Sequence, residues 1–214
     1  MHTTLWPLFD LVVHTPRLEL RYPDDGLAMK LAALTAEPIH DAGTMPFSMP
    51  WTDAPVEDLP RGSLKHFWSR RASWEPDDWS CPLAVIVDGE VVGVQDVMAK
   101  QFAQTRVVKT GSWLTMRRQG EGIGKEMRAA ILHLAFDGLD AQTAFTSAWR
   151  DNAASQGVTK SLGYEPNGWD VQLRRDAADR MHHYVLTRDR WLERRRDDIT
   201  IEGLEPCLAL FGIS

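Results

Sequence analysis

The chain has 214 residues, of which 43% are hydrophobic, and its formal net charge is −6. This length and hydrophobic content predict one domain with a substantial core over residues 1–214, because no stretch rich in proline, glycine and serine separates two halves. The acidic charge argues against a nucleic-acid-binding protein, which normally has a basic surface, and no apolar run approaches the roughly 18–20 residues that span a membrane.

The N-terminal third predicts a strand, two helices and a long loop. Residues 15–22 alternate apolar and charged side chains, which is the period of a half-buried strand. Asp24 or Asp25 can cap the helix that follows. Five prolines within residues 38–60 exclude a regular helix there and predict a structured loop. A second helix is expected over about residues 61–73.

The rest of the chain predicts alternating strands and helices. Two β-branched runs joined at Asp88-Gly89 predict a hairpin over residues 83–98. The other elements expected are strands at about 106–116, 144–149, 171–174 and 183–186, and helices at about 123–139 and 153–162. This order predicts an α/β (α+β) fold in which a mixed sheet carries helices on its faces. Residues 192–214 are expected to form a C-terminal extension.

Three glycines, Gly120, Gly122 and Gly124, lie between a predicted strand and a predicted helix. Because glycine has no side chain, successive N–H groups can converge there, and the helix N-terminus adds about half a positive charge. Such a turn can bind phosphate or diphosphate oxygens, and Arg118 and Lys125 can add positive charge. The alternative interpretation is a tight turn from strand to helix that binds no ligand.

Two other phosphate-binding motifs fit this turn poorly. A P-loop requires Ser or Thr after Gly-Lys, whereas Glu126 follows Lys125 here. A dinucleotide-binding fold has the pattern G-x-G-x-x-G early in the chain after a parallel strand, whereas this chain has G-x-G-x-G past its middle. Binding of a nucleoside triphosphate therefore stays only a weaker alternative.

The glycine segment resembles the Q/R-x-x-G-x-G/A acyl-CoA signature of the GNAT superfamily, anchored on Gln119, Gly122 and Gly124. Three further segments are similar to that family in the same order: residues 15–21 to the opening strand of its RimJ/RimL-like branch, residues 151–164 to its second cofactor segment, and residues 186–191 to its closing strand. The four matches span residues 15–191. The proline-rich loop is similar to that of an actinobacterial subset of this branch, some of which is linked to succinyl transfer.

The resemblance implies a GNAT fold, whose mostly antiparallel sheet splays at the cofactor strand and carries helices on both faces. It implies that the N–H of Leu114 or Met116 polarises the thioester carbonyl. It also implies that Asn152 binds the pantetheine and that Ser155 protonates the departing thiolate; a turn residue and a helix-start hydroxyl are the respective alternatives. The cofactor-binding residues expected for acetyl-CoA or succinyl-CoA are Leu114, Met116, Gln119, Gly120, Gly122, Ile123, Gly124, Lys125, Asn152 and Ser155.

Acyl transfer to an amine also needs a group that accepts the amine proton. Related enzymes often place a glutamate on the cofactor strand two positions before the glycine that is Gly111 here, but this chain has Lys109 at that position. Asp96 on the preceding predicted strand is the substitute candidate for the catalytic base. The alternative interpretation of Asp96 is a solvated or edge-strand carboxylate.

Together these features predict an N-acyltransferase that moves an acetyl or succinyl group to a primary amine of a protein or a small molecule. A non-catalytic acyl-CoA-binding or regulatory module is the alternative, because Lys109 replaces the usual glutamate. No metal is expected, since the histidines lack metal-ligand spacing. Cys81 and Cys207 do not form a C-x-x-C pair, which suits a reducing cytoplasm. The apolar C-terminal segment can pack on its own domain or on a second copy in a homo-oligomer.

Overall fold

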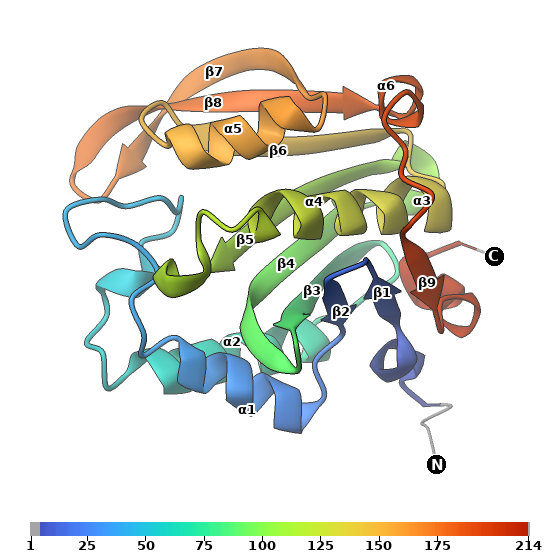
Figure 1. Ribbon diagram of the computed structural model, residues 1–214, viewed down its shortest axis with the longest axis horizontal. Coiled ribbons are helices and arrows are strands. Elements are labelled where there is room, and N and C mark those ends of the chain that lie inside the picture. The colour runs from blue at the N-terminus through green and yellow to red at the C-terminus, as the bar shows by residue number, and fades with distance from the viewer. Residues whose placement is uncertain (1–4, 214) are drawn as a thin grey trace.

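The computed structural model describes residues 5–213, which form one nine-stranded sheet flanked by helices (Figure 1). The strands are β1 Val12–His14, β2 Leu18–Arg21, β3 Asp78–Val87, β4 Glu90–Lys100, β5 Val107–Leu114, β6 Thr143–Trp149, β7 Glu165–Arg174, β8 Ala177–Thr187 and β9 Thr200–Glu202. The helices are α1 Asp25–Leu34, α2 Leu59–Ala72, α3 Phe102–Thr105, α4 Ile123–His133, α5 Ala153–Ser161 and α6 Arg188–Leu192. Short 3₁₀ segments lie at Pro7–Asp10, Trp51–Asp53, Met116–Arg118 and Glu205–Phe211, and a π-helical turn at Leu134–Gly138 extends α4.

The strands lie in the order β7-β8-β6-β5-β4-β3-β2-β1-β9. Every neighbouring pair is antiparallel except β5 and β6, which are parallel. The predicted mixed, mostly antiparallel sheet is therefore confirmed.

Helices cover both faces of the sheet (Figure 1). On one face, α1 and α2 pack on small and branched side chains of the central strands, in a cluster of Ala28, Leu31, Phe67, Ala84 and Val94 with Trp113 at its border. On the opposite face, α4 buries its apolar side against the main core. Because side chains alternate along a strand, Val94 and Trp113 mark the α2 face, and their sequence neighbours mark the α4 face.

The one parallel pair is short, and the sheet opens beyond it. Strands β5 and β6 pair only between residues 107–109 and 143–145. The remainder of β5 still pairs with β4, as far as Leu114, and the remainder of β6 still pairs with β8, as far as Trp149. A V-shaped gap therefore separates the ends of β5 and β6 in the middle of the sheet, as the predicted splay requires.

Local signals in the sequence predicted several element boundaries. Asp24 caps α1, because its carboxylate accepts a hydrogen bond from the Leu27 N–H at 2.7 Å. At the β3–β4 turn, Asp88 and Gly89 have φ angles of 50° and 79°, as a type I′ hairpin turn requires. Residues 38–50 contain no helix, and α2 begins two residues before its predicted start.

The C-terminal segment is part of the domain. Strand β9 pairs with β1, and the last 3₁₀ turn places Phe211 in ring contact with Trp74 and Trp79. Cys207 and Phe211 are fully buried. Of the two packing modes open from the sequence, the structure shows packing on the chain's own domain. Within residues 5–213, no helix combines the length and the apolar character needed to cross a lipid bilayer.

Candidate functional site

The glycine turn before α4 presents a row of unpaired backbone donors. Gly120 and Gly122 have φ angles of 81° and 82°, which suit glycine far better than other residues, and Gly122 is the N-cap of α4. The N–H groups of Lys125 and Glu126 both donate to the Gly122 carbonyl, at 3.2 Å. Among residues 5–213, no group accepts a hydrogen bond from the N–H groups of residues 120–124. These free donors and the helix terminus together suit an anion.

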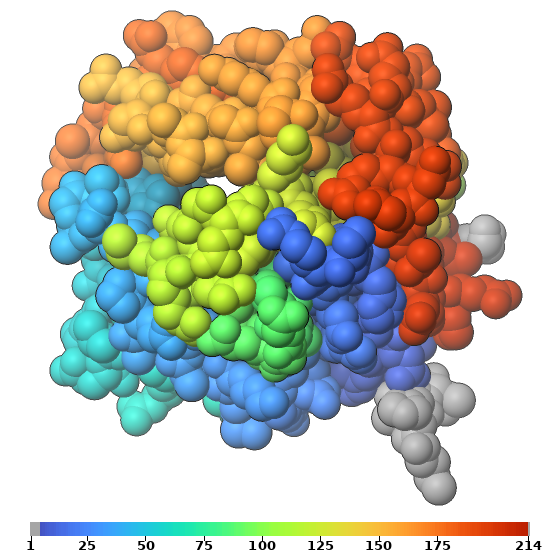
Figure 2. All heavy atoms as spheres, viewed as in Figure 1, coloured from blue at the N-terminus to red at the C-terminus, as the bar shows by residue number. Residues whose placement is uncertain are grey.

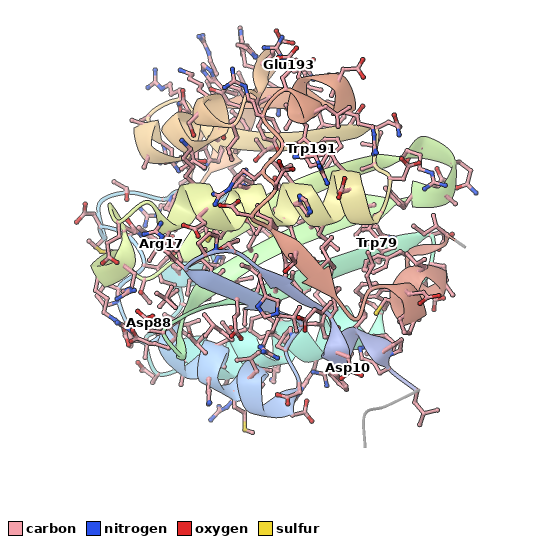
Figure 3. The ribbon with its side chains drawn as sticks, turned by 45° about the vertical axis from the view of Figure 1, so that its right-hand side comes forward. Asp10, Arg17, Trp79, Asp88, Trp191 and Glu193 are labelled. Atoms are coloured by element: carbon pink, nitrogen blue, oxygen red, sulfur yellow. The ribbon has the colours of Figure 1, made fainter. Side chains whose placement is uncertain are left out.

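A buried carboxylate fixes this turn to the start of β2. Glu126, which is 6% exposed, accepts hydrogen bonds from the Thr15 hydroxyl at 2.6 Å and from the Arg17 Nε at 2.7 Å, and it pairs with Arg17 Nη2 at 2.6 Å. Arg17 Nη1 also donates to the Glu121 carbonyl at 3.2 Å. Figure 3 labels Arg17 beside the beginning of α4. Because the guanidinium is paired with Glu126, this contact holds the glycine turn in place without adding net charge beside it.

The side chain of Gln119 and the backbone of Met116 are engaged within the protein. The Gln119 amide donates to the carbonyls of Ile39 and Leu114, at 2.8 and 2.9 Å. The Met116 N–H donates to the Pro38 carbonyl at 2.9 Å. Both residues thus tie the loop after α1 to the end of β5. Of the two N–H groups expected to polarise a thioester, only that of Leu114 is left for this role.

The register of β5 shows where its free backbone groups point. Thr115 donates its N–H to the Val92 carbonyl of β4, at 3.0 Å. Since alternate residues of an antiparallel strand face opposite neighbours, Trp113 also faces β4, and the N–H groups of Ser112 and Leu114 face the gap. An extended chain placed in the V can therefore pair with β5 as a missing strand would.

The second segment expected at the cofactor lies across this gap. The Asn152 side-chain oxygen accepts the Ser155 N–H at 3.0 Å and so caps α5. Within the described part of the chain, the Ser155 hydroxyl makes no hydrogen bond, and this side chain is only half-buried. Figure 2 shows an opening in this face of the molecule between the beginning of α4, α5 and the loop that follows α1.

On the α2 face, the loop between α1 and α2 (residues 35–58) covers the gap and is here called the aromatic loop. Phe47 and Trp51 lie 5.2 Å apart between ring centroids, and Trp51 lies 6.0 Å from Trp113 of β5. The Trp149 Nε1 of β6 donates to the Phe47 carbonyl at 3.1 Å. The loop therefore spans from one wall of the V to the other.

Two arginines at the tip of the β7–β8 hairpin hold this loop. Arg174 Nε donates to the Met45 carbonyl at 2.8 Å. Arg175 makes a two-pronged ion pair with Asp53, with Nε–Oδ2 and Nη2–Oδ1 distances of 2.8 and 2.7 Å. The aromatic loop is thus a bridge between the hairpin and β5.

Asp96 lies on the α2 face of β4, directly opposite Gly111 of β5. Its Oδ2 accepts a hydrogen bond from the Ser80 hydroxyl at 2.9 Å, and its Oδ1 is buried without a partner among residues 5–213. Burial raises the pKa of Asp96 to about 7, against the opposing effect of the Ser80 hydrogen bond. A carboxyl with this pKa can exchange a proton at neutral pH, and Gly111 places no side chain between it and the gap.

A buried arginine lies on the other face, at the base of the gap. Arg128 of α4 is 4% exposed and donates to Gln95 Oε1, Thr146 Oγ1 and Ser112 Oγ at 3.3, 3.2 and 3.1 Å. Among residues 5–213, no carboxylate lies within 4.0 Å of its guanidinium. Burial lowers the pKa of Arg128, and the nearby Tyr164 opposes this shift. Sequence reasoning did not identify Arg128, because a charged residue within an amphipathic helix gives no sign of being buried.

The structure brings the glycine turn, β5 and α5 together, because a Cβ on Gly124 would lie 3.7 Å from Val158 of α5 and 3.9 Å from Leu114 of β5. The cofactor-binding role of these segments stays a prediction. Arg71 of α2 lies away from the gap, where it pairs with Asp25 at 2.8 Å and donates to the Pro23 carbonyl. Its neighbour Arg70 lies close enough to Asp96 to lower the pKa of that carboxyl. Within residues 5–213, no three His, Cys, Asp or Glu side chains are grouped as metal ligands would be. Both cysteines are free and buried.

Comparison with known proteins agrees with this geometry. Residues 17–165 match the family model described as an acetyltransferase (GNAT) domain. Among solved structures, the chain is similar to RimJ of Mycobacterium smegmatis in complex with CoA-disulfide, with 18% identity, a TM-score of 0.66, and coverage of 98% of this chain and 97% of that one. It is also similar in structure to RimL, a ribosomal L7/L12 α-N-protein acetyltransferase in complex with coenzyme A, with 18% identity, a TM-score of 0.66, and coverage of 82% of this chain and 97% of that one.

The microcin C7 self-immunity acetyltransferase MccE, in complex with acetyl-CoA and AMP, has 15% identity and a TM-score of 0.65, with coverage of 80% of this chain and 93% of that one. At these identities the structural likeness shows a common fold. The family match covers more than two thirds of the sequence, and it confirms the resemblance first drawn from four short segments. The chain therefore belongs to the GNAT acetyltransferase family.

Proposed function

We propose that this protein transfers an acyl group from acyl-CoA directly to a primary amine, either a protein N-terminus, a lysine or a small amine. The observation that carries the proposal is the gap between β5 and β6, which is lined by unpaired N–H groups and begins beside the free amides of the glycine turn. A diphosphate on the turn and a pantetheine arm along β5 would satisfy both sets of donors. We further propose that it acts in the cytoplasm, where its two free thiols would stay reduced.

In this arrangement the Leu114 N–H donates to the thioester oxygen and stabilises the oxyanion that forms there. The amine nitrogen attacks the thioester carbon, the carbon–sulfur bond breaks, and the coenzyme A thiolate departs. The Ser155 hydroxyl, half-buried and without another partner among residues 5–213, donates a proton to that thiolate and takes one back from solvent. Asn152 orients α5 and contacts the pantetheine.

Asp96 is the proposed acceptor for the amine proton. Its raised pKa leaves a useful fraction of carboxylate at neutral pH. Gly111 pairs with Asp96 and has no side chain, so the Asp96 carboxylate has access to an amine above β5. Base catalysis therefore does not require a glutamate at the position that Lys109 occupies.

Thiol release from acetyl-CoA and succinyl-CoA across a panel of amines tests the proposal, together with calorimetric binding of coenzyme A. We expect turnover with at least one amine and its loss in Asp96→Asn with coenzyme A binding intact. Tight coenzyme A binding without turnover on any amine would instead favour a non-catalytic acyl-CoA-binding module. Failure to bind coenzyme A would refute both.

A specific observation favours a donor whose acyl group ends in a carboxylate, with succinyl as the second candidate beside acetyl. A guanidinium offers five N–H donors, and Arg128 directs its three hydrogen bonds to neutral oxygens only. A buried cation normally has an anionic partner. An acyl chain continuing past Leu114 toward the base of the gap would bring its carboxylate to this cation.

Replacing Arg128 with glutamine separates the two donors. We expect kcat/KM with succinyl-CoA to fall by about 10- to 100-fold, the range for a hydrogen bond to a charged group, while acetyl-CoA turnover changes little. Arg71→Gln, on the opposite face, is the matched control. An equal loss with both donors in a folded Arg128→Gln protein would reject the carboxylate assignment, as would wild-type protein that ignores succinyl-CoA.

A further inference from the structure

A row of polar side chains crosses the α2 face of the sheet at the mouth of the gap. Asp96 of β4 is paired with Gly111 of β5. The parallel register of Lys109 with Phe145 places Ser147, two residues on, opposite Gly111 across the V. Ser147 is in turn paired with His183 of β8. A group above Gly111 is therefore flanked by Asp96 on one wall and by Ser147 on the other.

Behind Ser147, two further side chains complete a hydrogen-bonded line across β6, β8 and β7. The Ser147 Oγ lies 2.9 Å from His183 Nδ1, and His183 Nε2 lies 3.1 Å from Asp170 Oδ1. Gln172 donates to both oxygens of Asp170, at 3.0 and 3.1 Å, and so fixes that carboxylate. Because a carboxylate only accepts, the His183 proton belongs on Nε2, and Nδ1 accepts the Ser147 hydroxyl proton.

This line lies on the α2 face of the sheet, the same face as Asp96. Ser147 shares its face of β6 with Trp149, whose indole donates to the aromatic loop, and that loop contacts Trp113 on the same face of β5. The line also reaches solvent: the side chains of His183 and Asp170 are 29% and 53% exposed. Asp96, in contrast, has its Oδ1 shielded from solvent.

We propose that Ser147, His183 and Asp170 form a proton relay for the acceptor, with Ser147 as the catalytic residue that touches the amine. This inference rests on the proposed acyl transfer, and it places a second set of catalytic groups on the side of the gap opposite Asp96. A primary amine arrives as an ammonium ion and loses two protons on becoming an amide nitrogen. One proton passes to Ser147 Oγ while the Ser147 hydroxyl proton moves to His183 Nδ1, which frees the lone pair for attack.

The second proton leaves the nitrogen after the carbon–nitrogen bond has formed, and it passes to the Asp96 carboxylate. Asp170 balances the positive charge of the imidazolium and holds its ring in place. His183 then returns its proton to solvent through its exposed edge, and Asp96 gives up its proton to solvent after the products have left the gap. Each proton thus has its own acceptor, and no further reactant is needed.

Four variants test the relay: Ser147→Ala, His183→Ala, Asp170→Asn and the control His182→Ala, which alters the neighbouring histidine on the opposite face of β8. We expect kcat to fall by about 100-fold in the first two, the lower end for a lost acid–base group, with the coenzyme A dissociation constant unchanged. Asp170→Asn should fall less. His182→Ala should behave as wild type.

Added imidazole provides a readout that a purely structural role would not give. It should restore part of the turnover of His183→Ala, where it can occupy the vacated space, but none of that of Ser147→Ala. Wild-type kcat in either Ser147→Ala or His183→Ala would overturn the relay while leaving the acyl transfer intact. Wild-type protein that binds coenzyme A but transfers to no amine would overturn the proposed function and the relay with it.

Discussion

The carboxylate of Glu126 is expected to stabilise the fold and the glycine turn together. In Glu126→Gln, one neutral oxygen remains for Thr15, but the ion pair with Arg17 is lost. A hydrogen bond to a charged group contributes about 1.5–3 kcal/mol. Since the Arg17 side chain is 51% exposed and can be resolvated, we expect the lower part of that range, a loss of about 2 kcal/mol in the free energy of unfolding.

The effect of Glu126 should depend on pH in a defined direction. Burial would raise the pKa of Glu126, but hydrogen bonds from Thr15 and Arg17 outweigh it and lower the pKa below its usual value. A carboxyl with a lowered folded-state pKa stabilises the protein above its unfolded pKa of about 4.3, and this contribution is lost as the pH falls further. The difference between wild type and Glu126→Gln should therefore be complete at neutral pH and shrink in acid.

Urea unfolding followed by tryptophan fluorescence measures this difference at neutral pH and in acid. Glu121→Gln is the matched control, because Glu121 lies in the same turn but is half-exposed and makes a longer ion pair, 3.5 Å from Arg118. This substitution should change the free energy of unfolding by no more than about 0.5 kcal/mol. The reasoning fails if Glu126→Gln unfolds at the wild-type urea concentration at neutral pH, or if its deficit is as large in acid.

Three further predictions concern the cofactor and the reaction. Gly122→Val should weaken coenzyme A binding at least tenfold in calorimetry, because the valine side chain would occupy the proposed diphosphate site. The control Gly89→Val, at a residue with a similar φ of 79° in the β3–β4 turn, should be destabilised but bind coenzyme A normally. Equal coenzyme A affinity in both variants would show that the diphosphate does not bind at the glycine turn. Ser155→Ala should lower kcat more than it weakens coenzyme A binding, and unchanged turnover would make Ser155 only part of the start of α5. Because Asp96 must be ionised to accept a proton and its pKa is raised to about 7, kcat/KM should fall as the pH drops below 7. Asp96→Asn should be more stable than wild type above that pH, since it does not bury a charge. If Asp96→Asn has the same pH profile of kcat/KM as wild type, Asp96 is not the base.

Features set by local chemistry could be predicted from the sequence. The Asp24 cap, the Asp88-Gly89 turn and the glycines before α4 each depend on a few neighbouring residues. The short strands β1 and β9 could not be predicted in this way. Each has three residues, and they exist because residues 12–14 meet residues 200–202, almost the whole chain away.

Candidate site residues could be named from the sequence where a motif contains them, but not where the pairing register of the strands brings them together. The glycine turn, Asn152 and Ser155 came from motifs. The engagement of Gln119 and Met116 by carbonyls of residues 38 and 39 depends on the tertiary path of the loop. His183 and Arg128 were missed because their significance lies in their neighbours across the sheet, which only the pairing of β5, β6 and β8 fixes.

The hairpin arginines give the aromatic loop a mechanical role. Because Arg174 and Arg175 fasten the loop to the β7–β8 hairpin, and Trp149 fastens it to β6, a closed frame of protein surrounds the gap on the α2 face, where the proposed acceptor would enter. A nucleophile at the end of a thin, extended segment can pass through such a frame, whereas a nucleophile on a broad, flat surface cannot. Access would then be set by the width of this frame as much as by the chemistry behind it.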